Sequence, residues 1–168
     1  MRAGDLKAVY GVVLVLVFAL VVVLLITSGL RAQGGESEWQ RGRLEGTWRV
    51  QLTVRDCQTG AALRAFPAVF VFAKGGTLTA TTAGQSPALF TPNLGVWRYT
   101  GGNTYSAVSE AFVFSPTGVW IQTHRLTRAI ELSDDANEFT DTVKLEIFGT
   151  TGNLIATGCA TSAARRCE

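Results

Sequence analysis

The sequence predicts an all-β protein, an eight-stranded antiparallel up-and-down barrel preceded by one N-terminal transmembrane or signal helix. Three observations support this prediction. An uncharged apolar run lies near the N-terminus, and apolar and polar residues alternate with a period of two in segments from residue 46 onward. Short turn sequences rich in Gly, Asn, Asp and Ser separate these segments, as expected for strands joined by hairpins.

The apolar run covers residues 8–26 and has 19 residues, close to the roughly 20 that a helix needs to cross a bilayer core. Arg2 and Lys7 precede it, as in a secretory signal, but it is longer than the usual signal core of about 7–15 residues. We expect residues 1–32 to be a retained membrane anchor, with secretion after cleavage near Ala32 as the alternative. Residues 33–45 form a polar tether, and residues 46–168 form the barrel domain.

The expected strands follow one another with few interruptions. The longest irregular piece, residues 83–93, suits either a loop over a barrel mouth or an ordinary crossing loop pinned by Leu89 and Phe90. Eight such strands either close or leave two edges prone to association, so closure is the better solution. An eight-stranded barrel holds side chains or one small ligand. The strands are expected at residues 46–56, 66–73, 77–82, 94–100, 103–115, 118–132, 138–149 and from 154 to about 162.

The segment 118–132 holds the only histidine of the chain. Strand alternation puts its even-numbered residues on one face, which therefore carries both bulky apolar and polar side chains. That mixture suits a barrel wall beside a cavity, or a core strand with a few satisfied polar groups. The residues that we expect to line a ligand pocket are Trp120, Gln122, His124 and Arg128.

Glu110 is a further candidate for the pocket, because it shares its strand face with Val108, Phe112 and Phe114. A carboxylate in apolar surroundings has a raised pKa and can act as an acid or a base. The alternative is that Glu110 faces solvent or pairs with an arginine of a neighbouring strand.

A Ser-His-Asp arrangement would have to use His124 with Asp141. Counting back from the turn at residues 134–137 places His124 opposite about Ile147, several residues from Asp141. A buried pair of Arg128 with Asp141 is the better expectation. Nucleophile signatures are absent, and an enzyme reading depends on Glu110 or His124 acting in a cyclase or isomerase.

Charge and cysteine content exclude other classes of protein. Residues 33–168 carry twelve basic and twelve acidic residues, with no basic stripe of the kind that nucleic-acid binding requires. The three cysteines are too few and too widely spaced for a paired-cysteine zinc site. We expect no metal and no cofactor.

Gly46-Thr47-Trp48 opens the first strand, and Arg165-Arg166 follows the last one. This pairing resembles the lipocalin and wider calycin pattern. The resemblance implies a pocket inside a barrel, with Trp48 at the closed end and either Arg165 or Arg166 packed across it. A cation over an indole face stabilises such a contact by about 0.5–2 kcal/mol.

The resemblance also bears on the cysteines. If Trp48 lies near Arg165, the antiparallel first and last strands place Cys57 opposite about residue 156, nearer to Cys159 than to Cys167. We expect a Cys57–Cys159 disulfide, with Cys57–Cys167 or no bridge as alternatives. A disulfide would place the domain outside the cytoplasm, in the periplasm or on the cell surface.

The function predicted from these features is the binding of a small, largely apolar ligand inside a membrane-tethered barrel. Two alternatives remain. One is the cyclase or isomerase reading, and the other is a non-catalytic envelope interaction module with a filled barrel, for which Leu89 and Phe90 would provide the contact.

Overall fold

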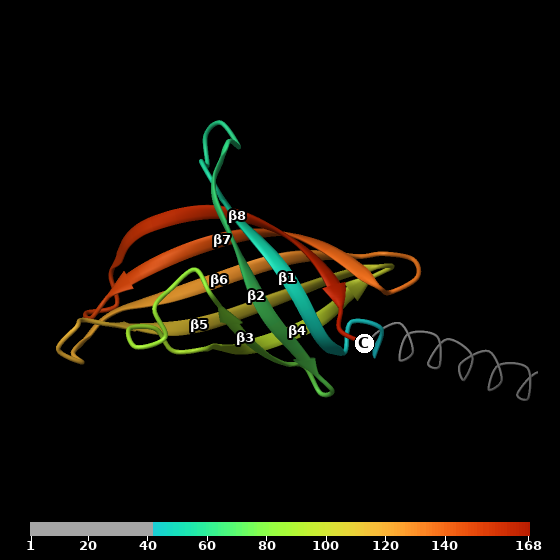
Figure 1. Ribbon diagram of the computed structural model, residues 1–168, viewed down its shortest axis with the longest axis horizontal. Coiled ribbons are helices and arrows are strands. Elements are labelled where there is room, and N and C mark those ends of the chain that lie inside the picture. The colour runs from blue at the N-terminus through green and yellow to red at the C-terminus, as the bar shows by residue number, and fades with distance from the viewer. Residues whose placement is uncertain (1–41) are drawn as a thin grey trace, which may run out of the picture. The chain divides into compact units, whose positions relative to one another are not determined.

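The computed structural model describes residues 42–168, so the expected anchor at residues 8–26 and most of the polar tether lie outside the described residues. Within the described part of the chain, no helix is both long and apolar enough to cross a membrane. The eight strands form a closed barrel in sequence order (Figure 1). They are β1 (Gly46–Arg55), β2 (Ala62–Ala73), β3 (Thr77–Thr82), β4 (Asn93–Gly101), β5 (Thr104–Phe114), β6 (Trp120–Leu132), β7 (Glu138–Gly149) and β8 (Leu154–Arg166).

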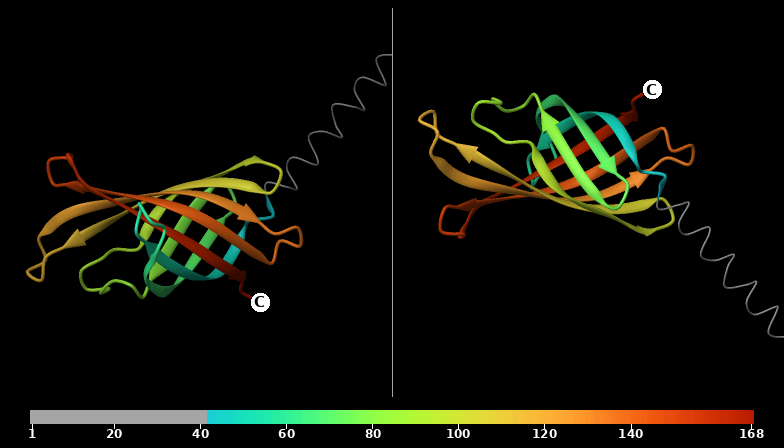
Figure 2. Two further views of the ribbon diagram at one scale, coloured as in Figure 1. Left: turned by 90° about the horizontal axis from the view of Figure 1, so that it is seen from above. Right: turned by 90° about the horizontal axis from the view of Figure 1, so that it is seen from below.

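The predicted antiparallel meander and its closure are both confirmed. β1 pairs with β8 along eight residues, from Trp48 opposite Arg166 to Arg55 opposite Cys159. β8 therefore runs four residues beyond its expected end near Ser162, because those residues form the ladder that closes the barrel. β2 to β4 cross β6 to β8 at a steep angle, as the strand tilt of a small barrel requires (Figure 2).

One end of the barrel is filled by aromatic side chains. Trp48 is fully buried, and its ring lies 4.9 Å from that of Phe139 in an edge-on arrangement. Phe72 packs edge-on against both Phe139 and Trp97. Leu44, which precedes β1 and is also fully buried, accepts the hydrogen bond of the Trp48 indole on its carbonyl at 3.0 Å. The described end of the tether therefore packs into the closed end of the barrel.

Arg166, rather than Arg165, makes the contact with Trp48. Its guanidinium carbon lies 4.3 Å from the indole centre, and it donates to the carbonyls of Arg43, Glu45 and Ala136. The first position of the Gly-x-Trp motif requires glycine for two reasons. Gly46 has a φ of 130°, and a Cβ on it would lie 2.7 Å from Arg166 Nη1. Arg165 is 83% exposed and pairs with Glu138 on the surface.

The structure agrees with the alternative given for Glu110, which pairs with Arg125 of the neighbouring strand and does not face inward. A bulge at the end of β4 shifts the register between Tyr99 and Gly101, and a one-residue shift moves every side chain of the next strand to the other face. The side chains of Tyr105, Ala107, Ser109 and Ala111 are therefore buried. Glu110 lies on the outer face instead.

The Cys57–Cys159 disulfide is confirmed. Cys57 lies in the turn between β1 and β2, and Cys159 lies on β8, so the bridge fastens the β1–β2 hairpin to the closing strand. The hairpin projects beyond the barrel wall (Figure 1). Cys167 is a free, exposed thiol.

Candidate functional site

The half of the barrel away from Trp48 contains an internal cavity of about 120 Å³. Its walls are mostly apolar, because the inward positions of β1, β2, β6 and β7 carry aliphatic and aromatic side chains at this level. The apolar residues of the wall include Leu52, Val54, Phe66, Phe70, Leu126, Val143 and Leu145. Gly158 on β8 leaves space here, since a Cβ on it would meet only the Leu145 side chain, at 3.4 Å or more.

A buried ion pair lies at the cavity wall, to which it contributes the side chain of Arg128. Arg128 Nη1 lies 2.7 Å from Asp141 Oδ2, and the two side chains are 3% and 0% exposed. Ser162 is a weaker partner of the same Nη1 at 3.5 Å. The guanidinium carbon lies 4.5 Å from the Phe70 ring centre, which adds a cation–π contact. The predicted pairing of Arg128 with Asp141 is confirmed, and it follows from the register that places Arg128 opposite Val143.

Three polar atoms of this region have no hydrogen-bond partner among the described residues: Arg128 Nε, Asp141 Oδ1 and Asn93 Oδ1. Arg128 and Asn93 both line the cavity. Buried polar groups in folded proteins nearly always have partners, and an unpaired one is costly. The unpaired atoms of Arg128 and Asn93 therefore mark the cavity wall as a place where a ligand can form hydrogen bonds.

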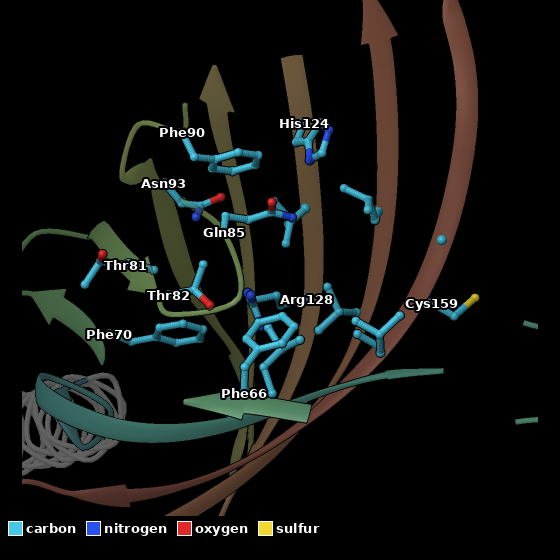
Figure 3. Close-up of a pocket in the computed structure, with 18 of the residues that line it drawn as sticks. Phe66, Phe70, Thr81, Thr82, Gln85, Phe90, Asn93, His124, Arg128 and Cys159 are labelled. Atoms are coloured by element: carbon cyan, nitrogen blue, oxygen red, sulfur yellow. The ribbon is translucent and has the colours of Figure 1, made fainter. Parts of the chain in front are cut away.

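His124 and Phe90 lie at the other end of the cavity (Figure 3). Their ring centres are 5.0 Å apart in an edge-on arrangement. Phe90 comes from the loop between β3 and β4, which is held to β5 by a bridge between Phe90 and Val113. Burial lowers the pKa of His124 below its usual value, so the imidazole is neutral at pH 7. The loop therefore covers this end with an aromatic side chain.

Of the residues expected to line the pocket, the structure brings His124 and Arg128 to the cavity. Gln122 lies beside them, with its Oε1 3.3 Å from His124 Nε2. Trp120 lies elsewhere: it is 40% exposed, its ring packs edge-on against exposed Phe112, and its indole donates to the Gln122 carbonyl. The register shift between Val113 and Phe114 interrupts the alternation on which the expectation for Trp120 depended.

Glu110 is also away from the cavity. It forms an ion pair with Arg125 across β5 and β6, with 2.7 Å between Arg125 Nη2 and Glu110 Oε1, on the outer wall. Glu110 and His124 therefore face opposite sides of the barrel wall. The structure does not assemble them into a single acid–base site.

The sequence reasoning missed Asn93, Gln85, Phe66 and Phe70. Asn93 is 7% exposed and occupies the first position of β4, on the same face as buried Trp97. Because Asn93 is four positions before Trp97, strand alternation could have predicted that it points inward. Gln85 reaches the cavity from the β3–β4 loop (Figure 3), and no periodic pattern indicates where a loop side chain points.

The arrangement is suited to binding a small molecule with an apolar body and one polar end. Within residues 42–168, no group of three or more His, Cys, Asp or Glu side chains is placed to hold a metal ion.

Comparisons with known proteins do not assign the chain to a family. No protein-family model matches the chain, and no curated protein matches it. Among solved structures, a DUF3598-family protein of unknown function from Nostoc punctiforme PCC 73102 is similar, with a TM-score of 0.39 and 11% sequence identity. The match covers 75% of this chain and 48% of that protein, so this chain spans about half of its length.

Proposed function

We propose that this chain is a membrane-tethered, extracytoplasmic β-barrel that binds a small, largely apolar molecule in its interior. The observation that carries the proposal is the cavity of about 120 Å³, which is closed by the aromatic core at one end and covered by Phe90 at the other. An apolar cavity with a few convergent polar groups is the usual form of a small-molecule site.

Two independent features support the proposed compartment. The Cys57–Cys159 disulfide is typical of an oxidising environment, because cytosolic thiols are kept reduced. The apolar run at residues 8–26 is long enough to hold the chain at a membrane. Export without the tether, after cleavage near Ala32, would leave the binding function unchanged.

Native mass spectrometry of the full chain, exported to an oxidising compartment and released from lipid nanodiscs, tests the proposal. We expect an adduct of discrete mass on the wild-type protein. Gly158→Leu is the matched control, because its side chain would project into the cavity beside Leu145 and displace the adduct. A bare wild-type protein that also takes up no fluorescent apolar probe would contradict the proposal.

One observation favours an interaction module as a second candidate. Leu94 and Val96 on β4 are 63% and 65% exposed, and Val96 pairs with half-exposed Val108 on β5, which gives an apolar strip on the outer wall. Leu89 and Phe90 do not support this candidate, because both are half-buried and Phe90 faces the cavity. Sedimentation of wild type against Val96→Lys, with and without envelope extract, would test whether the strip binds a partner.

A further inference from the structure

Two deeply buried side chains face the cavity with hydrogen-bonding capacity that the fold does not use. Arg128 is 3% exposed and its Nε–H has no acceptor, while Asn93 is 7% exposed and its Oδ1 has no donor, among the described residues. One atom is a donor and the other an acceptor. The cavity lining therefore offers a complementary pair of polar groups among apolar residues.

The strand register and one ring contact relate both groups to Phe70. Asn93 pairs with Ala80, and Ala80 pairs with Phe70 on the other side. The Arg128 guanidinium lies over that same Phe70 ring, 4.5 Å from its centre. Figure 3 shows both side chains on the wall of the same cavity, Asn93 from β4 and Arg128 from β6. Both unpaired atoms therefore belong to residues that border the space a ligand would occupy.

The charge of the site disfavours an anion. Asp141 Oδ2 lies 2.7 Å from Arg128 Nη1, so the buried cation already has its counter-charge. A carboxylate bound beside them would bring a second negative charge into an apolar cavity, with Asp141 Oδ1 still unpaired nearby. Burying an unpaired charge is much more costly than burying a hydrogen-bonded neutral group.

The volume limits the size of the ligand. The cavity of about 120 Å³ is slightly smaller than an engineered cavity of about 150 Å³ that binds benzene. It suits one ring, or an aliphatic group of similar volume, with one polar substituent.

We propose, on the basis of the ligand-binding function above, that the cavity is selective for a small neutral alcohol or primary amide. Its polar end accepts a hydrogen bond from Arg128 Nε and donates one to Asn93 Oδ1, while its apolar body lies between Phe66, Leu126 and Phe90. A hydroxyl or amide group can make both bonds at once. A hydrocarbon leaves both atoms unpaired, and a carboxylate cannot donate to Asn93.

The test uses the full chain in lipid nanodiscs and three ligands of one shape: benzyl alcohol, toluene and benzoate. Methyl NMR follows the cavity-lining methyls of Leu126 and Leu145 at measured free ligand concentrations. In wild type we expect benzoate to bind at least about tenfold more weakly than benzyl alcohol. In Asn93→Leu we expect the ratio of alcohol affinity to toluene affinity to fall about tenfold, because the acceptor is lost while the apolar wall remains.

A second variant and a control keep the test decisive. Arg128→Met combined with Asp141→Leu replaces the ion pair by apolar side chains of similar volume, which proteins often tolerate, and should lower the same ratio. Thr127→Val, which changes the outward neighbour of Arg128, should leave it unchanged. Unchanged ratios in both cavity variants, or benzoate binding as tightly as the alcohol, would overturn the inference while leaving the binding function intact. If none of the three ligands shifts the cavity methyls, the inference and the binding function are both overturned.

Discussion

Arg166 should contribute more to stability than any other surface-accessible arginine of the closed end. Its guanidinium donates to three backbone carbonyls at 2.6–2.9 Å and lies 4.3 Å from the Trp48 ring centre. A hydrogen bond contributes about 1 kcal/mol on average and a cation–π contact about 1 kcal/mol. Because the side chain is half-buried and water can replace some of these bonds, we expect Arg166→Ala to reduce the free energy of unfolding by about 3 kcal/mol.

Urea unfolding followed by tryptophan fluorescence measures this loss, which corresponds to a midpoint lower by roughly 2 M for a domain of this size. Arg165→Ala is the matched control. Arg165 forms an exposed ion pair with Glu138 of the neighbouring strand, and such pairs contribute about 0–1 kcal/mol to stability. If the two variants lost equal stability, or if Arg166→Ala lost less than about 1 kcal/mol, the assigned role of Arg166 at the closed end would be refuted.

Three further predictions concern other parts of the barrel. Gly95→Ala should weaken the pairing of β4 with β5 and prevent a stable fold, because its Cβ would lie 2.0 Å from the backbone oxygen of Val108. Circular dichroism and proteolysis would show the loss of structure, and near-wild-type stability would contradict the prediction. Reduction of the Cys57–Cys159 disulfide, or replacement of both cysteines by serine, should lower the free energy of unfolding by about 3–5 kcal/mol, because the two cysteines are 102 positions apart in the sequence. An unchanged urea midpoint after reduction would argue against this prediction. His124 has a folded-state pKa below its unfolded value, so the unfolded chain binds more protons. Its contribution to stability should therefore fall as the pH drops below about 6.5 and level off below the folded pKa. In matched unfolding series, the free energy of unfolding of the wild type should therefore fall relative to that of His124→Gln as the pH drops over that range. A difference between the two that does not change with pH would show that His124 is not the titrating group.

Alternation alone predicted the parts of the fold where each strand keeps its period. β1 and β6 place their bulky residues at every second position, and the turn at residues 134–137 set the register that pairs Arg128 opposite Val143. From that register the buried Arg128–Asp141 pair followed directly. The disulfide prediction depended in addition on the lipocalin resemblance, which placed Trp48 near Arg165; the resulting register for β1 and β8 differs from the observed one by a single residue.

The errors arise at bulges and in the loop. The bulge near Tyr99 exchanged the two faces of β5, so small residues such as Ala107 and Ser109 point inward while Phe112 points out. Residue size could not reveal this, because the inward face of β5 combines one large residue, Tyr105, with the small residues Ala107, Ser109 and Ala111. Asn93 was overlooked because an asparagine after Pro92 is typical of a turn, although here it begins a strand.

The pairing of β1 with β8 has a consequence for how the chain assembles. Within the described barrel, every other ladder joins strands that follow one another in sequence, so those ladders form by short-range hairpin closure. The β1–β8 ladder joins the two ends of the domain and requires the closure of a loop of more than a hundred residues, which is entropically the most demanding step. Because Cys167 donates its backbone N–H to the Thr47 carbonyl, the two ends lie side by side at this seam. Which ladder closes the barrel last in sequence therefore depends only on where the chain begins and ends. If a short linker joined the two ends of the domain and the chain were opened at the Lys74–Gly76 turn, the circular permutant would have the same ladders, but β2 and β3 would be its closing pair.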